Sequence, residues 1–95
     1  MKRVDANQVE IVKALRQVGA EWIHTSEATD CGFDGVILWR GRSLIAECKD
    51  GNKPPSQRKL TDNEEKTKAK CEARGVPYLI LTSPIQAVET LAEFH

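Results

Sequence analysis

Two acidic residues in the middle of the chain have the types and the spacing of a metal-dependent hydrolytic site. Asp34 lies in the β-rich run FDGVILW and Glu47 in the β-rich run RSLIAECK, and only Arg40-Gly41 separates the two runs. Two such runs joined by a Gly-containing pair are typical of a β-hairpin. If Arg40 and Gly41 form a two-residue turn, the register of the hairpin places Asp34 directly opposite Glu47.

Asp34, Glu47 and Lys49 then form one patch at the open end of the hairpin. Opposed residues of an antiparallel pair project to the same side, with Cβ atoms about 4.5–5.5 Å apart, and Lys49 shares that side because it follows Glu47 by two residues. Facing carboxylates are destabilising unless a cation compensates them, and Mg²⁺ takes oxygen ligands of this kind. The backbone carbonyl of Cys48 can add a neutral oxygen. With a lysine ammonium to hold an attacking water, the patch predicts hydrolysis of a phosphodiester.

A plain structural interpretation competes with this one. Any Glu-x-Lys on a strand can be a surface salt bridge, and a turn longer by one residue would remove the direct opposition of Asp34 and Glu47. The strand before Glu47 carries Leu44, Ile45 and Ala46, which is typical of a buried strand. A buried setting for the acid favours function.

Length, charge and cysteine content narrow the class of protein that carries this patch. The chain has 95 residues, 14 basic and 14 acidic, and a formal net charge of +0. This length predicts a single domain over residues 1–95. Three widely spaced cysteines without a Cys-x-x-Cys pair favour neither a disulfide framework nor a zinc knuckle, and they suit a reducing cytoplasm. No apolar run has the length of a membrane span or of a signal peptide.

The elements that must position the patch follow the order α-β-β-β-α-β-α. The predicted segments are a helix over 5–18, a strand over 21–25, the hairpin over 33–49, a loop over 50–56, a helix over 57–74, a strand over 78–82 and a last helix that Ser83-Pro84 begins. The run YLILT is continuously apolar, which is typical of a strand buried on both faces. A helix between the hairpin and this run permits a parallel crossover, so we expect an α/β fold with a mixed sheet flanked by helices.

The motifs GFDG, then ECK after eleven residues, then KPPSQ resemble the PD-(D/E)xK nuclease superfamily, and within it the small stand-alone VRR-NUC nucleases related to Holliday-junction resolvases. The resemblance implies a restriction-endonuclease-like fold and a metal-dependent endonuclease acting on DNA, with Mg²⁺ or Mn²⁺ held by Asp34 and Glu47. It also implies that Lys49 serves the attacking water and that Gln57 matches the glutamine that opens the following helix.

Two positions depart from the family pattern. Phe33 stands where the family usually has proline, which removes only a backbone constraint. The acid expected on the first helix is replaced by Gln8, and the nearest acid is Glu10, toward the polar face. Either Gln8 supplies one neutral oxygen to the metal or Glu10 reaches in if the helix is rotated. The missing acid also favours an alternative function, a catalytically inactive DNA-binding or protein-interaction module that keeps the nuclease fold.

Basic residues are concentrated near the patch along the sequence. Residues 40–59 hold six basic residues against two acidic ones, a net charge of +4 in a chain whose total is zero. Together with the acidic site, this basic segment predicts contacts with DNA phosphates. The alternative is that its lysines and arginines are ordinary surface residues of turns. The residues expected to contact DNA are Arg40, Arg42, Lys53, Arg58 and Lys59. We expect a structure-selective enzyme for branched or junction DNA, acting as a homodimer, with no membrane and no small-molecule cofactor.

Other residues that could do chemistry receive ordinary roles. His24 is expected to be a packed or surface histidine, and Cys48 a core residue. Glu64 belongs to a charge run that is expected to solvate one face of its helix.

Overall fold

The computed structural model describes residues 6–25 and 31–94, so Asp5 and most of the polar turn expected over 26–32 lie outside the described residues. The elements follow the expected order α-β-β-β-α-β-α. They are α1 (Ala6–Gln17), β1 (Glu21–His24), β2 (Gly35–Trp39), β3 (Arg42–Cys48), a short 3₁₀ helix (Pro55–Gln57), α2 (Asp62–Glu72), β4 (Tyr78–Leu81) and α3 (Pro84–Leu91).

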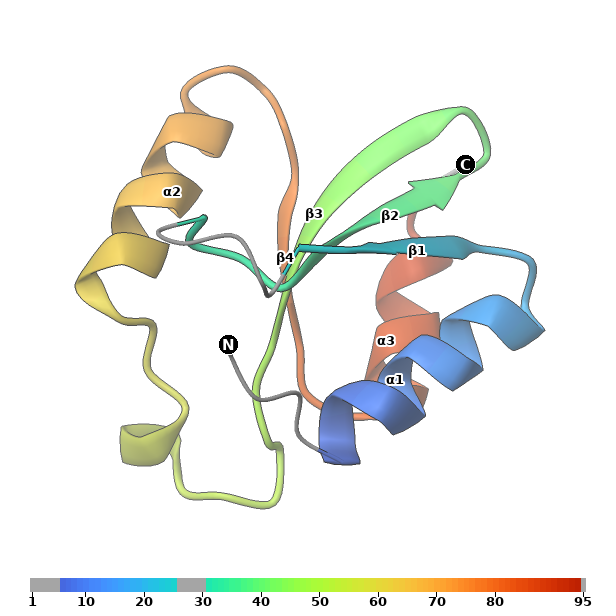
Figure 1. Ribbon diagram of the computed structural model, residues 1–95, viewed down its shortest axis with the longest axis horizontal. Coiled ribbons are helices and arrows are strands. Elements are labelled where there is room, and N and C mark those ends of the chain that lie inside the picture. Colours follow the sequence, from blue (N-terminus) through green and yellow to red (C-terminus); the bar gives the residue numbers. More distant parts are fainter. Residues whose placement is uncertain (1–5, 26–30, 95) are drawn as a thin grey trace.

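The four strands form one mixed sheet in the order β1-β2-β3-β4. The first three strands are antiparallel, and β4 runs parallel to β3 after the crossover through α2. Helices α1 and α3 lie side by side against one face of the sheet, and α2 lies on the other side (Figure 1). The expected mixed α/β architecture is therefore confirmed. None of the helices in the described part of the chain has the length and apolar character needed to cross a membrane.

The two-residue turn of the hairpin is confirmed. Trp39 pairs with Arg42, and the register continues to Gly35 opposite Ala46. Both central residues of the turn have positive φ, 48° at Arg40 and 79° at Gly41. Positive φ at both positions defines the type I′ turn, whose twist matches that of the flanking strands. The turn therefore fixes the alignment that the site requires.

The core lies between the sheet and the pair α1 and α3. Ile11 and Leu15 of α1 are fully buried against strand residues that include Ile37 and Leu81. Gly35 has a steric role here, because a Cβ at this position would lie 2.3 Å from the Trp22 ring and 2.8 Å from the carbonyl oxygen of Ile23. The ring of Trp22 thus packs directly on the β2 backbone at Gly35, the residue that follows Asp34.

The start of α2 differs from the expectation. The helix begins at Asp62 and not at Gln57, because Thr61 is its N-cap: the Thr61 hydroxyl accepts a hydrogen bond from Glu64 N, and the Glu64 side chain accepts one from Thr61 N. This reciprocal arrangement is a capping box. Gln57 instead ends the short 3₁₀ helix that Pro55 begins. The prolines and the Thr-x-x-Glu spacing both favour the later start.

Gly35→Ala tests the packing of Trp22 on β2. The added methyl group must displace the indole ring or the adjacent backbone, so we expect a loss of about 3 kcal/mol in the free energy of unfolding. Gly41→Ala is the control, since the turn has open space at that position and only the positive φ is penalised, by about 1 kcal/mol. Urea denaturation measures both. A Gly35→Ala variant as stable as Gly41→Ala would contradict the packing described here.

Candidate active site

The hairpin brings Asp34 and Glu47 together where β2 begins and β3 ends. Both side chains are buried, with exposed fractions of 4% and 3%. The backbone N–H of Asp34 donates to the carbonyl oxygen of Ala46 at 2.9 Å, and its Oδ2 accepts a hydrogen bond from the backbone N–H of Cys48 at 2.9 Å. The charge of Asp34 acts on the carboxyl of Glu47, and the two are hydrogen-bonded. Two carboxyl groups therefore share one buried site.

Lys49 points to the same site from the end of β3. Its Nζ lies 3.7 Å from Oε2 of Glu47 and 2.9 Å from Oε1 of Glu64. The Lys49 side chain is largely buried, so neither contact is an ordinary surface salt bridge. Cys48 lies between Glu47 and Lys49 in the sequence. Its side chain is buried in the core cluster on the other face of the sheet, as the alternation of side chains along a strand predicts.

Glu64 is a site residue that the sequence analysis missed. The expectation that it solvates a helix face is wrong, because its exposed fraction is 6%. Its Oε1 accepts hydrogen bonds from the backbone N–H of Thr61 at 2.8 Å and from Nζ of Lys49 at 2.9 Å. The same carboxylate thus caps α2 and holds the lysine. The Thr-x-x-Glu spacing was the signal that distinguishes Glu64 from its neighbour Glu65, which is exposed.

The carboxyl of Glu47 is held in a setting that disfavours its charge. Burial is the largest cause, followed by the charge of Asp34, the hydrogen bond to Asp34 and the charge of Glu64; together they raise the pKa of Glu47 from 4.5 to about 9. Lys49 opposes this shift without overcoming it. Oε1 of Glu47 is buried without a hydrogen-bond donor.

Burial and the neighbouring charges also shift the pKa values of Glu64 and Tyr78, in opposite directions. Burial opposes ionisation of Glu64, but the hydrogen bonds from Lys49 and from the backbone of Thr61 outweigh it and hold the pKa of Glu64 below its usual value. Burial and the charges of Glu47 and Glu64 raise the pKa of Tyr78. The Tyr78 hydroxyl donates to the carbonyl oxygen of Gly32 at 2.8 Å. Glu64 is therefore the ionised partner of Lys49, and Tyr78 is a neutral donor.

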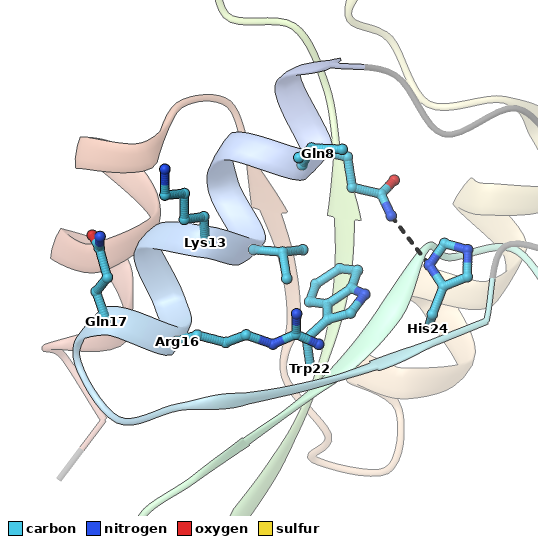
Figure 2. Close-up of a pocket in the computed structure, with 8 residues that line it drawn as sticks. Gln8, Lys13, Arg16, Gln17, Trp22 and His24 are labelled. Atoms are coloured by element: carbon cyan, nitrogen blue, oxygen red, sulfur yellow. Dashed lines mark hydrogen bonds between the residues drawn. The ribbon is translucent and has the colours of Figure 1, made fainter.

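The first turn of α1 reaches the site from the other side of the sheet. Nδ2 of Asn7 donates to the carbonyl oxygen of Lys49 at 2.8 Å. Gln8 is buried, and its Nε2 lies 3.4 Å from Nδ1 of His24 (Figure 2). Glu10 is exposed. Of the two residues considered for the missing acid, the inward one is Gln8, and His24 is a surface histidine with Gln8 as its partner.

The basic residues are split between the two ends of β3. Arg40 and Arg42 lie at the closed end of the hairpin, roughly 16 Å from Glu47 at about 3.3 Å per strand residue, and Arg40 lies over the ring of Trp39 at 4.8 Å. They therefore do not surround the acid pair, which corrects that part of the expectation. Lys53, Arg58 and Lys59 lie between β3 and α2, two elements that supply site residues. Nε of Arg58 is buried without a hydrogen-bond partner.

The remaining expected site residue, Gln57, lies exposed on the 3₁₀ helix. The residue that the start of α2 places in the site is Glu64. Within residues 6–25 and 31–94, no group of three or more His, Cys, Asp or Glu side chains is arranged to hold a metal ion. A metal at this site would have two carboxyl ligands, from Asp34 and Glu47, and would complete its shell with neutral oxygens.

Comparisons with known proteins found no relative of this chain. No protein-family model matches the sequence, and neither a curated protein nor a solved structure was found to be similar.

The raised pKa of Glu47 predicts a pH dependence of stability without metal. The unfolded chain releases this proton near pH 4.5 and the folded protein near pH 9, so the folded state binds more protons in between and stability falls as the pH rises through that window. Glu47→Gln removes this proton release. In EDTA, we expect the Tm of wild type minus that of Glu47→Gln to become more negative from pH 5 to pH 9. A constant difference would show that Glu47 is ionised throughout.

Proposed function

We propose that the chain is a divalent-metal-dependent endonuclease that hydrolyses phosphodiester bonds in DNA and has a restriction-endonuclease-like fold. One observation carries the proposal: a buried pair of carboxyls, Asp34 and Glu47, stands beside a buried lysine, and one oxygen of Glu47 lacks a partner. For structure alone, this arrangement is unfavourable, because buried carboxyls near each other destabilise the fold. A Mg²⁺ or Mn²⁺ ion offsets that cost.

Asp34 and Glu47 fit such an ion, with the backbone carbonyl of Cys48 and the side chain of Gln8 as neutral oxygens. When bound, the metal supplies positive charge for the phosphate oxygens and favours ionisation of water. Lys49 orients the attacking water from the Glu47 side. Glu64 positions Lys49, since its carboxylate is the nearer of the two partners and is itself fixed by the helix cap. Attack in line leaves a 5′-phosphate and a 3′-hydroxyl.

The loop between β3 and α2 supports DNA as the substrate. It carries Lys53, Arg58 and Lys59, positively charged side chains of the kind that contact DNA phosphates. Basic side chains that contact phosphates do not distinguish one DNA sequence from another. We therefore propose selectivity for branched or junction DNA, with a homodimer supplying two active sites. Exposed Gln57 belongs to this loop and is proposed as a contact to DNA.

A second candidate function is a DNA-binding module that has lost catalysis. Gln8 in place of an acid favours it, as does the absence of a third carboxyl ligand among the described residues. The two candidates differ in whether metal leads to cleavage.

Cleavage of labelled branched and linear DNA with Mn²⁺ tests the proposal. We expect metal-dependent cutting by the wild type and a loss of at least about 100-fold in kcat for Glu47→Ala and for Lys49→Ala. Lys70→Ala, an exposed lysine of α2, is the control and retains activity. Binding without cutting by the wild type would favour the non-catalytic module. Cutting that survives Glu47→Ala would overturn the site assignment.

Gln8→Glu tests which residue completes the site. A carboxylate at the inward position adds ligand charge, so we expect Mn²⁺ to bind about tenfold more tightly by calorimetry. Glu10→Gln is the matched change on the outward face and leaves the affinity unchanged. If Glu10→Gln weakens Mn²⁺ binding and Gln8→Glu has no effect, the helix presents Glu10 to the metal instead.

A further inference from the structure

A groove between α1 and β1 leads away from the candidate active site. It encloses about 650 Å³, within the range of about 300–1,000 Å³ that is typical of ligand pockets. Figure 2 shows it from the side, with α1 above and β1 below. The residues used in the argument are Gln8, Val12, Lys13 and Arg16 from α1 and Trp22 and His24 from β1.

One end of the groove lies near the acid pair but on the opposite face of the sheet, because Ala46 and Cys48 pack in the core beside α1 and Glu47 alternates with them. His24 and Gln8 mark this end, and His24 pairs with Gly35, the residue after Asp34. The next residue, Thr25, donates its backbone N–H to the carbonyl oxygen of Asp34 at 3.0 Å. A DNA strand bound at the acid pair would pass around the ends of β1 and β2, beside His24 and Gln8, to enter the groove.

The lining combines an apolar floor with positive charge. Val12 and Trp22 are buried side chains at the bottom, and no lining residue is acidic. Lys13 is exposed and has no ion-pair partner in the part of the chain that the structure describes. Arg16 pairs with Glu21 at 3.1 Å, and both side chains are more than half exposed. The groove is therefore suited to a flexible anion that also carries flat apolar groups.

Resting on the proposed nuclease function, we propose that this groove binds the unpaired DNA strand on one side of the cleaved phosphate. Lys13 contacts the backbone phosphates, and the exposed imidazole of His24 contacts a base at the mouth, as aromatic side chains contact unstacked bases. We assign a single strand and not a duplex to the groove because its volume, about 650 Å³, is that of a ligand pocket. The enzyme should thus prefer DNA with a single-stranded arm beside the cleavage point.

Fluorescence anisotropy in EDTA tests the groove without any cleavage. The probes are a fluorescein-labelled blunt duplex and the same duplex with a 5′ or a 3′ single-stranded arm. We expect the wild type to bind an armed duplex more tightly than the blunt one. Lys13→Glu should weaken binding of the armed duplex on the order of tenfold and reduce the slope of log K against log salt by about 1. Lys70→Glu is the matched control on α2 and stays within about twofold of the wild type.

The outcomes separate this proposal from the nuclease function. Lys13→Glu binding the armed duplex as tightly as Lys70→Glu would overturn the groove assignment, even if the protein cleaves DNA. Equal binding of blunt and armed duplexes by the wild type would overturn it as well. Selective, Lys13-dependent binding by a protein that never cleaves with Mn²⁺ would support the groove and contradict the nuclease function.

Discussion

The Arg40-Gly41 turn sets the register of the β2–β3 hairpin, and the position of the acid pair follows from that register. A slip by one residue would move Glu47 to the opposite face of the sheet. The core opposes such a slip, because Ile37 and Leu44 pair with each other and are both buried against α1 and α3. The turn and the core thus specify the same alignment. The site is therefore built on a hairpin whose register is fixed twice, by its turn and by its buried side chains.

That constraint brings the buried carboxyls of Asp34 and Glu47 together, and it places the ammonium of Lys49 between Glu47 and a third buried carboxyl, that of Glu64. The groups share the ammonium unequally. Glu64 stays ionised because Lys49 and the α2 cap donate to it, whereas Glu47 keeps its proton at neutral pH without a metal. Apolar side chains of similar volume at these positions would make the fold more stable. An unfavourable buried arrangement on a well-packed hairpin is typical of a functional site.

Sequence reasoning predicted the element order and the hairpin register, because short-range signals determine both: the Gly-containing pair sets the turn, and apolar periodicity sets the faces. It failed at Glu64, whose burial depends on how α2 packs against Lys49, a residue 15 positions away in the sequence. It also misplaced Arg40 and Arg42, because closeness in the sequence was taken for closeness in space although a strand separates them from the site. The groove beside α1 was not foreseen, since it depends on how α1 lies over β1.

A crystal soaked in Mn²⁺ at mildly alkaline pH tests the central claim most directly, with anomalous scattering to locate the metal. The account predicts an Mn²⁺ peak between the carboxyls of Asp34 and Glu47, and no peak there in crystals of Glu47→Gln. Mn²⁺ that binds elsewhere, or a wild-type acid pair that stays empty while Lys49 remains between Glu47 and Glu64, would contradict it.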